Sequence, residues 1–332
     1  MSLAQLTVIG TARRMSFAFT FPGQGSQTPG MGKDLADAYP AARQVFQEVD
    51  DALGEPLSRI IFEGPEAGLT LTRNAQPALM AVSLAAMAAL EKEFGADAIK
   101  PAFVAGHSLG EYSALAAAGV FSLTDAAKLL RLRGTAMQEA VPQGQGAMLA
   151  LLGAEIDSAE RLAAGAAEND VCQVANDNAP GQIVISGSKA AIDRAAQMAS
   201  QFGIRRAVPL PVSAPFHCSL MKPAAERMAL ALESVTLNPP RFPLISNVTA
   251  RPVLEPSEIK MLLVRQVTGV VRWRESVAYM VDNGADTIFE IGAGRVLTGL
   301  ARRIRSEADA RAMGTPAEIA AFGDWLKALM AA

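Results

Sequence analysis

Cysteine, histidine and excess positive charge are all scarce in this sequence. Its 332 residues include two cysteines, Cys172 and Cys218, without a CxxC pair. Neither a disulfide framework nor a zinc site is therefore expected, and a reducing, cytoplasmic compartment fits. Lys and Arg number 30 against 33 Asp and Glu, which gives a net charge of −3. This balance lacks the basic excess of a nucleic-acid-binding protein.

Long apolar runs are also missing. No run approaches the roughly 18 residues that a membrane-spanning helix needs. Half of the residues are nonetheless hydrophobic, which is enough for a sizeable core in one large domain or two unequal ones. Residues 1–14 have no convincing signal-peptide cleavage site and precede a second start-like methionine, Met15. We interpret them as a leader outside the fold.

Apolar stretches of strand length alternate with stretches of helical periodicity along most of the chain. Strands are expected at 16–21, 101–106, 242–247 and 287–292, and helices at 40–53, 75–94, 108–118, 124–140, 221–232 and 258–267. This alternation predicts an α/β fold, in which a mostly parallel sheet is flanked by helices.

The pattern changes in the middle of the chain. From Gly146 onward the expected order is strand, helix, strand, strand, helix, strand, which is the ferredoxin-like βαββαβ order. We predict a small domain, 141–213, inserted into a large catalytic domain made of 15–140 and 214–310. The remaining segment, 311–332, is predicted as a C-terminal helix that Thr315 and Pro316 open.

The segment Gly106-His107-Ser108-Leu109-Gly110 matches the pattern GxSxG. A predicted strand ends beside it and an alanine-rich helix follows, which is the context of a nucleophile elbow. Such a turn lifts the serine hydroxyl above the sheet and aims helix N–H groups at a developing oxyanion. The alternative is a small residue that only packs where a strand meets a helix.

A nucleophilic serine needs a base, and the chain has only two histidines. His107 adjoins Ser108 on a tight turn, so the two side chains should point in different directions. His217 is therefore the candidate base, although a lone histidine is more often a hydrogen-bonded loop residue. No acidic third member is evident, because Asp282, Asp286 and Glu290 follow the histidine, contrary to the hydrolase order.

Two further features are ambiguous from the residues alone. The segment "FPGQGSQTPGMGK" departs from phosphate-binding glycine motifs, but its backbone N–H groups could complete an oxyanion hole; a simple turn is the alternative. Arg131 and Arg133 lie on the helix after the elbow. If one of them faces a cleft, its guanidinium would bind a substrate carboxylate in a bidentate manner.

Several motifs in order carry a family resemblance across almost the whole chain after Met15: "FPGQGSQ", "GHSLGEYSAL", Arg133-Gly134, "QEAVPQGQGAM", "NDNAPGQIVISG", "PFHC" and "VRQ". Together they resemble the malonyl-CoA:acyl-carrier-protein transacylases of bacterial fatty-acid synthesis. The resemblance implies a large hydrolase-like α/β domain with a ferredoxin-like insert. It also implies ping-pong transfer of malonyl from malonyl-CoA to a phosphopantetheine thiol through a malonyl-serine ester, with no metal or other cofactor.

The resemblance also implies residue roles. Ser108 is similar to the family's nucleophile and His217 to its base, and Arg133 to the arginine that binds the malonyl carboxylate. The other implied roles are the oxyanion-hole N–H groups of Gln24 and Leu109, the backbone carbonyl of Gln266 that orients the histidine, and pocket positions at His107, Phe216 and Asn178. The segment "GAG" at 292–294 departs from the family's usual GPG, away from the implied chemistry.

Other readings remain open at this point. A serine thioesterase or esterase would share the elbow, an acyltransferase could supply a polyketide synthase, and a catalytically silent docking module belongs to a different class. The expected partners are a CoA thioester and acyl carrier protein, without nucleic acid or membrane, and the chain is expected to be a monomer. Candidate positions for a basic docking face are Lys33, Lys128, Lys189 and Arg272.

Overall fold

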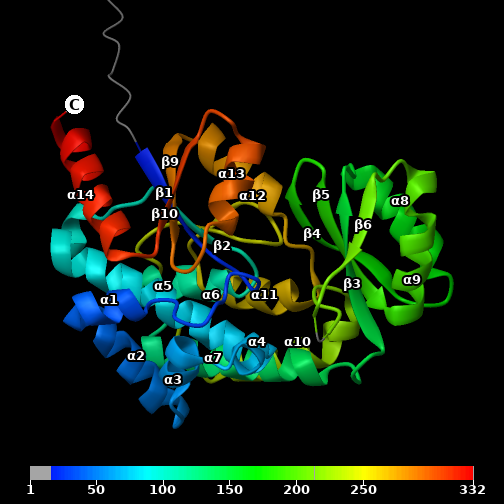
Figure 1. Cartoon of the computed structure of the whole chain (residues 1–332), viewed down its shortest axis with the longest axis horizontal. Coiled ribbons are helices and arrows are strands. Elements are labelled where there is room, and N and C mark those ends of the chain that lie inside the picture. The colour runs from blue at the N-terminus through cyan, green and yellow to red at the C-terminus, as the bar shows by residue number, and fades with distance from the viewer. Residues whose placement is uncertain (1–15, 213, 332) are drawn as a thin grey trace, which may run out of the picture.

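A six-stranded sheet organises most of the chain in the computed structural model, which describes residues 16–212 and 214–331 (Figure 1). The predicted leader, 1–14, lies outside the described residues. The strand order is β10-β9-β1-β2-β7-β8. All neighbours pair in parallel except β7 and β8, which are antiparallel. The strands are β1 (Ser16–Phe21), β2 (Phe103–Gly106), β7 (Leu244–Ile245), β8 (Pro252–Val253), β9 (Ala285–Ile291) and β10 (Asp309–Met313).

Helices cover both faces of this sheet, as the alternation along β1 requires. Phe17, Phe19 and Phe21 belong to the larger apolar core, whereas Ala18 belongs to a second core on the other face. The larger core is built with α1 (Lys33–Ala38), α2 (Pro40–Leu53), α3 (Leu57–Glu63), α4 (Glu66–Thr70), α5 (Thr72–Phe94), α6 (Gly110–Ala117), α7 (Leu123–Glu139), α10 (Lys222–Glu233), α11 (Pro256–Thr268) and α14 (Pro316–Ala331). The second core packs α12 (Trp273–Asp282) and α13 (Val296–Ile304) against the strands.

A second, four-stranded sheet lies to one side of the first (Figure 1). Its elements follow one another as β3 (Gly146–Leu152), α8 (Ile156–Ala167), β4 (Cys172–Ala179), β5 (Gln182–Ser188), α9 (Lys189–Met198) and β6 (Arg206–Pro209). The strand order is β4-β5-β3-β6 with antiparallel neighbours, and a separate apolar core lies between this sheet and its helices. The division of the chain at 141 and 213 stays a prediction, and Ser213 is not among the described residues.

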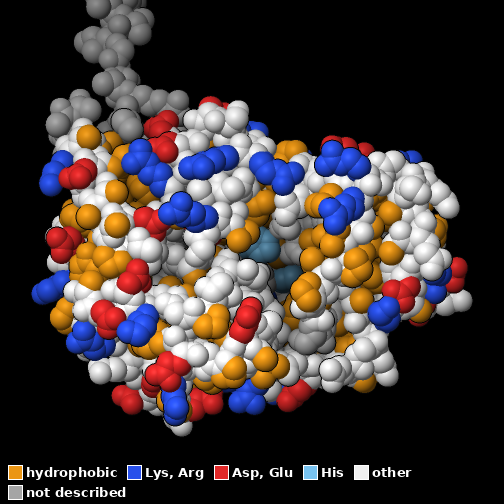
Figure 2. All heavy atoms as spheres, viewed as in Figure 1, with side chains coloured by type: hydrophobic (Ala, Val, Ile, Leu, Met, Phe, Trp, Pro, Cys, Tyr) orange, Lys and Arg blue, Asp and Glu red, His pale blue; other side chains and the backbone are white. Residues whose placement is uncertain are grey.

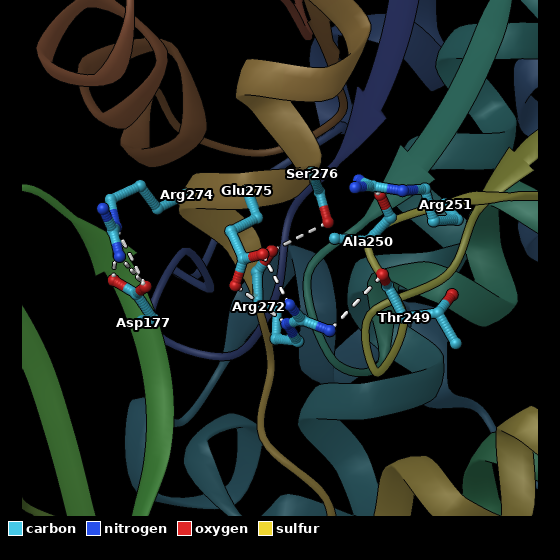
Figure 3. Close-up of polar contacts among 8 residues, drawn as sticks. All are labelled: Asp177, Thr249, Ala250, Arg251, Arg272, Arg274, Glu275 and Ser276. Carbon is cyan, nitrogen blue, oxygen red and sulfur yellow. Dashed lines mark hydrogen bonds and ion pairs between the residues drawn. The ribbon is translucent and has the colours of Figure 1, made fainter. Parts of the chain in front are cut away.

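The two sheets are joined along β4. Asn176 forms a parallel bridge with Val271, Asp177 N donates to Val271 O at 3.0 Å, and Val271 N donates to Ala175 O at 2.9 Å. The carboxylate of Asp177 also forms an ion pair with Arg274 of α12 (Figure 3). Between the two sheets the surface is hollowed, and histidine side chains are visible inside the hollow (Figure 2).

The predicted α/β class with a mostly parallel, helix-flanked sheet is confirmed, but two boundaries are corrected. The helix expected from Ser108 begins at Gly110, because the turn occupies His107 to Leu109. The segment 311–332 is not helical throughout, because strand β10 occupies Asp309–Met313, while the helix begins at Pro316, where Thr315 and Pro316 predicted its start. Within the described ranges, no helix combines the length and the apolar character that crossing a bilayer requires.

Candidate active site

The turn after β2 leaves no room for a side chain at either glycine of the GxSxG pattern. A Cβ atom on Gly106 would lie 1.8 Å from the carbonyl oxygen of Gly110, and one on Gly110 would lie 2.2 Å from the carbonyl oxygen of Phe21. Ser108 has a φ of 52°, which is rare for a residue with a side chain. Such backbone strain persists only where the surroundings enforce it, and it concentrates at functional sites.

The hydroxyl of Ser108 faces His217, which lies 109 residues further along the chain. Ser108 Oγ lies 2.7 Å from His217 Nε2, and His217 Nδ1 lies 2.9 Å from the backbone carbonyl oxygen of Gln266. Because a carbonyl can only accept, Nδ1 carries the hydrogen and Nε2 keeps its lone pair toward the serine. Burial, and next to it the charge of Arg133, lower the pKa of His217 to about 3, so the imidazole is neutral at pH 7.

Among the described residues, no carboxylate is hydrogen-bonded to this histidine, which is held by the Gln266 carbonyl. Of the three acids considered as a third member, Glu290 accepts hydrogen bonds from the first turn of α13, and Asp282 pairs with Arg305. Asp286 accepts from the backbone of Ser16. The structure therefore places a backbone carbonyl where a serine hydrolase has an acid.

The register of β1 and β2 brings the loop after β1 to the elbow. Phe21 pairs with Gly106, so both strands end at the same edge of the sheet, and Gln24 and Leu109 line one cleft. Among the described residues, no hydrogen-bond acceptor is present for the backbone N–H of either. Two N–H groups without an acceptor on residues that line the same cleft as the serine are what an oxyanion hole needs.

Arg133 is the arginine that reaches this cleft. It is 1% exposed, and its Nη2 atom lies 3.2 Å from Ser108 Oγ and 2.8 Å from Gln266 Oε1. The Nη1 atom donates to Gln76 Oε1 at 2.8 Å, and Nε has no partner among the described atoms. The guanidinium thus contacts only neutral groups within hydrogen-bond distance.

Arg131, the other candidate, points away from the cleft. It forms an ion pair with Glu55 at 2.5 Å and hydrogen-bonds Asn74 and the backbone of Arg73. The ambiguity between the two arginines is therefore resolved by geometry, since only Arg133 lies near Ser108.

The pocket positions divide between the two sheets. His107 Nε2 lies 2.8 Å from Asn178 Oδ1 of β4, so the histidine beside the nucleophile contacts the small sheet instead of the serine. Burial lowers the pKa of His107 as well. Phe216 is 8% exposed and lines the cleft directly before His217.

Behind the elbow lies a set of buried polar side chains that was not predicted from the sequence. Asn247 accepts from Ser108 N at 2.8 Å and donates to Gly106 O at 2.6 Å. The side chain of Gln266 donates from Nε2 to Ser108 O at 2.8 Å and to Glu111 Oε2 at 2.6 Å. The only signal in the sequence was a set of polar residues inside apolar segments, "ISN", "VRQ" and "GEY", which gives no pairing.

These residues surround a cleft of about 540 Å³ between the two sheets. Ser108, His217, Arg133, Gln24, Leu109, His107 and Phe216 all line it, together with Asn176 of β4 and the apolar side chains of Met137, Met148 and Leu210. Within 16–212 and 214–331, no three His, Cys, Asp or Glu side chains converge as a metal site would. A serine–histidine pair, two free N–H groups and a buried guanidinium suit acyl transfer from an ester or thioester that carries a carboxylate.

Comparisons with known proteins agree with this chemistry. Residues 18–318 match the acyl transferase domain family. A curated Escherichia coli protein, malonyl CoA-acyl carrier protein transacylase, is 45% identical over 305 residues, 92% of this chain and 98% of its own. The Bacillus subtilis protein of the same name is 45% identical over 303 residues, 91% of this chain and 94% of its own.

Solved structures give the same result. The crystal structure of an acyl-carrier-protein S-malonyltransferase from Bartonella henselae is 57% identical and has a TM-score of 0.92, covering 94% of this chain and all of its own. A malonyl-transacylase in complex with its type II polyketide acyl-carrier protein is 43% identical, with a TM-score of 0.89 over 92% of this chain and 98% of its own. The resemblance noted in the sequence is thereby confirmed.

Proposed function

This chain belongs to the malonyl-CoA:acyl-carrier-protein transacylases of the acyl transferase family, and we propose that Ser108, His217 and Arg133 carry that activity in it. One observation supports the proposal above the others. The guanidinium of Arg133 lies 3.2 Å from Ser108 Oγ, and the same oxygen lies 2.7 Å from His217 Nε2. A carboxylated acyl group can therefore meet its charge partner and the nucleophile together.

In the first half-reaction His217 Nε2 takes the proton of Ser108 Oγ, which attacks the thioester carbonyl of malonyl-CoA. The N–H groups of Gln24 and Leu109 stabilise the tetrahedral oxyanion. When the C–S bond breaks, the CoA sulfur receives the proton from His217. The product is a malonyl ester on Ser108.

The second half-reaction runs the same steps in reverse. The phosphopantetheine thiol of acyl carrier protein gives its proton to His217 and attacks the ester carbonyl, and Ser108 leaves with that proton. A serine ester and a thioester are close in energy, so acid–base and oxyanion stabilisation suffice for the exchange. The carbonyl of Gln266 holds the imidazole in the required tautomer throughout.

Selectivity for malonyl over acetyl groups follows from Arg133. A buried guanidinium surrounded by neutral groups gains a charge-assisted pair when a carboxylate arrives, whereas a methyl group leaves it unpaired. Part of the lowered pKa of His217 comes from the same charge. Neutralisation of Arg133 by the substrate should therefore also make His217 a stronger base.

Acyl carrier protein is the proposed partner, because a similar transacylase binds one. Supply of fatty-acid synthesis is proposed, as the family resemblance implies, and supply of a polyketide synthase is the alternative, since one similar transacylase binds a polyketide carrier protein. Of the basic positions considered for docking, Lys33, Lys189 and Arg272 each pair with a neighbouring carboxylate. A monomer in the cytoplasm is proposed, where the free, buried thiols of Cys172 and Cys218 would stay reduced.

The test is to incubate the protein with malonyl-CoA and holo acyl carrier protein. Malonyl-carrier protein and a malonyl adduct on Ser108, found by intact mass and peptide mapping, are expected. Rapid release of free malonate without carrier product would mean a hydrolase, and a chain that forms no adduct would be a silent docking module.

A further inference from the structure

Glu111 is a buried carboxylate that the mechanism above does not use. It lies in the first turn of α6, three residues after the nucleophile, and is 1% exposed. Burying a carboxylate is costly unless hydrogen bonds or a counter-charge compensate for the lost hydration. Its surroundings should therefore show which of the two it has.

Neutral groups make all of its hydrogen bonds. Gln266 Nε2 donates to Oε2 at 2.6 Å, and Asn247 N donates to Oε1 at 3.3 Å. Ser246, whose buried hydroxyl has no other partner among the described atoms, also interacts with this carboxyl. The charged and titratable groups that act on it are Arg133 from α7 and Tyr112 on its own helix, while α11 and the loop after β7 present only amides and that hydroxyl.

The Gln266 amide joins this carboxylate to Arg133. Its Nε2 end faces Glu111, and its Oε1 end accepts from Arg133 Nη2 at 2.8 Å. One buried negative charge and one buried positive charge therefore lie at opposite ends of a single amide. While the cleft is empty, the two charges balance without touching.

A substrate carboxylate disturbs this balance. Once it binds Arg133, two buried carboxylates share one guanidinium, and like charges at such a site raise the pKa of one of them. The substrate group would contact the guanidinium directly, whereas Glu111 is separated from it by an amide. The proton should therefore go to Glu111, whose carbonyl oxygen can still accept from Gln266 when the group is protonated.

We infer that Glu111 balances the charge of the acyl pocket: it accompanies Arg133 in the empty site and takes up one proton from solvent when the malonyl carboxylate occupies Arg133. This inference rests on the proposed function. It is consistent with the pKa of Glu111, which burial already raises to about 7 in the empty site, against the opposing effects of its hydrogen bonds and Arg133. Selection of malonyl groups would thus be coupled to pH through a residue that never contacts substrate.

The experiment counts protons. Malonyl-CoA is titrated by calorimetry into the Ser108→Ala protein, which cannot turn it over, at pH 8 in two buffers of different ionisation enthalpy. Uptake approaching one proton per malonyl-CoA, beyond the value for CoA or acetyl-CoA, is expected if binding raises the pKa of Glu111 from about 7 to above the pH of the titration. Adding Glu111→Gln should abolish this uptake.

Glu290 offers a matched control. It is equally buried, with 0% exposure, and accepts hydrogen bonds from Leu297 N and Thr298 N at the start of α13, away from the cleft. Glu290→Gln in the Ser108→Ala protein should therefore keep the proton uptake. Uptake that persists in the Glu111→Gln protein would assign the proton to another group, such as His217, and overturn the inference.

A second measurement needs no variant at Glu111. The ratio of the malonyl-CoA to the acetyl-CoA dissociation constant of the Ser108→Ala protein should rise roughly fivefold from pH 7.5 to 8.5, and a flat ratio would overturn the inference. Failure of malonyl-CoA to bind, together with no malonyl transfer by the wild-type chain, would refute the proposed function itself. Binding without proton uptake would refute only the role of Glu111.

Discussion

The two walls of the cleft are held in place by different forces. The wall from the large sheet carries Ser108 and Arg133, which are held by buried hydrogen bonds to each other and to Gln266 behind them. The wall from the small sheet carries Asn176, and its β4 strand is attached by short backbone pairing and by the Asp177–Arg274 ion pair, whose arginine is 35% exposed (Figure 3).

This difference indicates that the two walls have different roles in catalysis. Buried groups that hydrogen-bond one another keep the fixed geometry that nucleophilic attack requires, whereas an ion pair with one partly exposed partner contributes less and is weakened by salt. We therefore expect substitutions in the large-sheet wall to change the chemistry, and those in the small-sheet wall to change activity only modestly.

Ser108→Ala should give the largest effect. Malonyl transfer should fall on the order of 10⁵-fold, because among the described residues it is the Ser108 hydroxyl that hydrogen-bonds His217 Nε2, while the neighbouring Cys218 thiol faces the backbone of Pro215. Steady-state transfer of radiolabelled malonyl to the carrier protein measures this, with the melting temperature as a control for folding. Residual transfer within tenfold of wild type would show that another residue carries the acyl group.

Arg133→Ala should come next and be selective. We expect kcat/KM for malonyl-CoA to fall on the order of 10³-fold while that for acetyl-CoA changes little, because only malonyl loses a charge-assisted pair. Arg131→Ala is the matched control on the same helix, since Arg131 pairs with Glu55 outside the cleft. Equal losses for both acyl groups would mean that Arg133 only supports the elbow.

The nucleophile, the base and the arginine of the cleft differ in how far the sequence alone could identify them. The GxSxG turn after an apolar strand and the scarcity of histidine pointed to Ser108 and His217, while Arg131 and Arg133 were separated only by the family resemblance until the structure showed their directions. Local pattern suffices for Ser108 because motif, strand and helix adjoin one another in the chain, whereas His217, 109 residues away, could be named only because the chain has two histidines.

The buried network behind the elbow could not be found in this way. Asn247 reaches Ser108 across 139 residues, and Gln266 reaches Glu111 across 155. Both contacts exist only because β7 and α11 pack beside β2 and α6, and hydrophobic periodicity carries no information on such pairings. Strand β10 escaped prediction for a related reason, since "DARAM" owes its strand conformation to pairing with β9.

His217→Gln should change how the free energy of unfolding depends on pH, because His217 is buried in its neutral form. The native pKa of His217 is about 3 against 6.5 for the free side chain, so below pH 6.5 the unfolded chain binds a proton that the native protein does not. Native stability from this group is therefore lost as the pH falls. From pH 6.5 to 4.5 the free energy of unfolding should drop about 2 kcal/mol more in wild type than in the variant.

Urea denaturation across this pH range measures that difference. Glu111 contributes in the opposite direction, because its raised pKa makes the native state favour the proton between pH 4.5 and 7, but it is present in both proteins and cancels. Equal pH dependence in wild type and variant would mean that His217 titrates in the folded state as a solvated histidine does.

Asp177→Asn should give the smallest effect and is the direct test of the small-sheet wall. Asp177 accepts from Arg274 Nε at 2.9 Å and from its Nη2 at 2.8 Å, so its loss weakens one attachment of β4 while the backbone pairing to Val271 remains. We expect a roughly threefold lower kcat/KM, a loss of about 1 kcal/mol in stability, and a shrinking difference from wild type at high salt.

Glu275→Gln is the control for Asp177→Asn. It removes the ion pair between Arg272, at the start of α12, and Glu275 on the same helix (Figure 3). This pair does not connect the two sheets, so malonyl transfer should stay at the wild-type rate. If Asp177→Asn instead lowered malonyl transfer as much as Arg133→Ala, the two walls would not differ in the way proposed. The position of Asn178 against His107 would then matter to the chemistry as much as the buried network does.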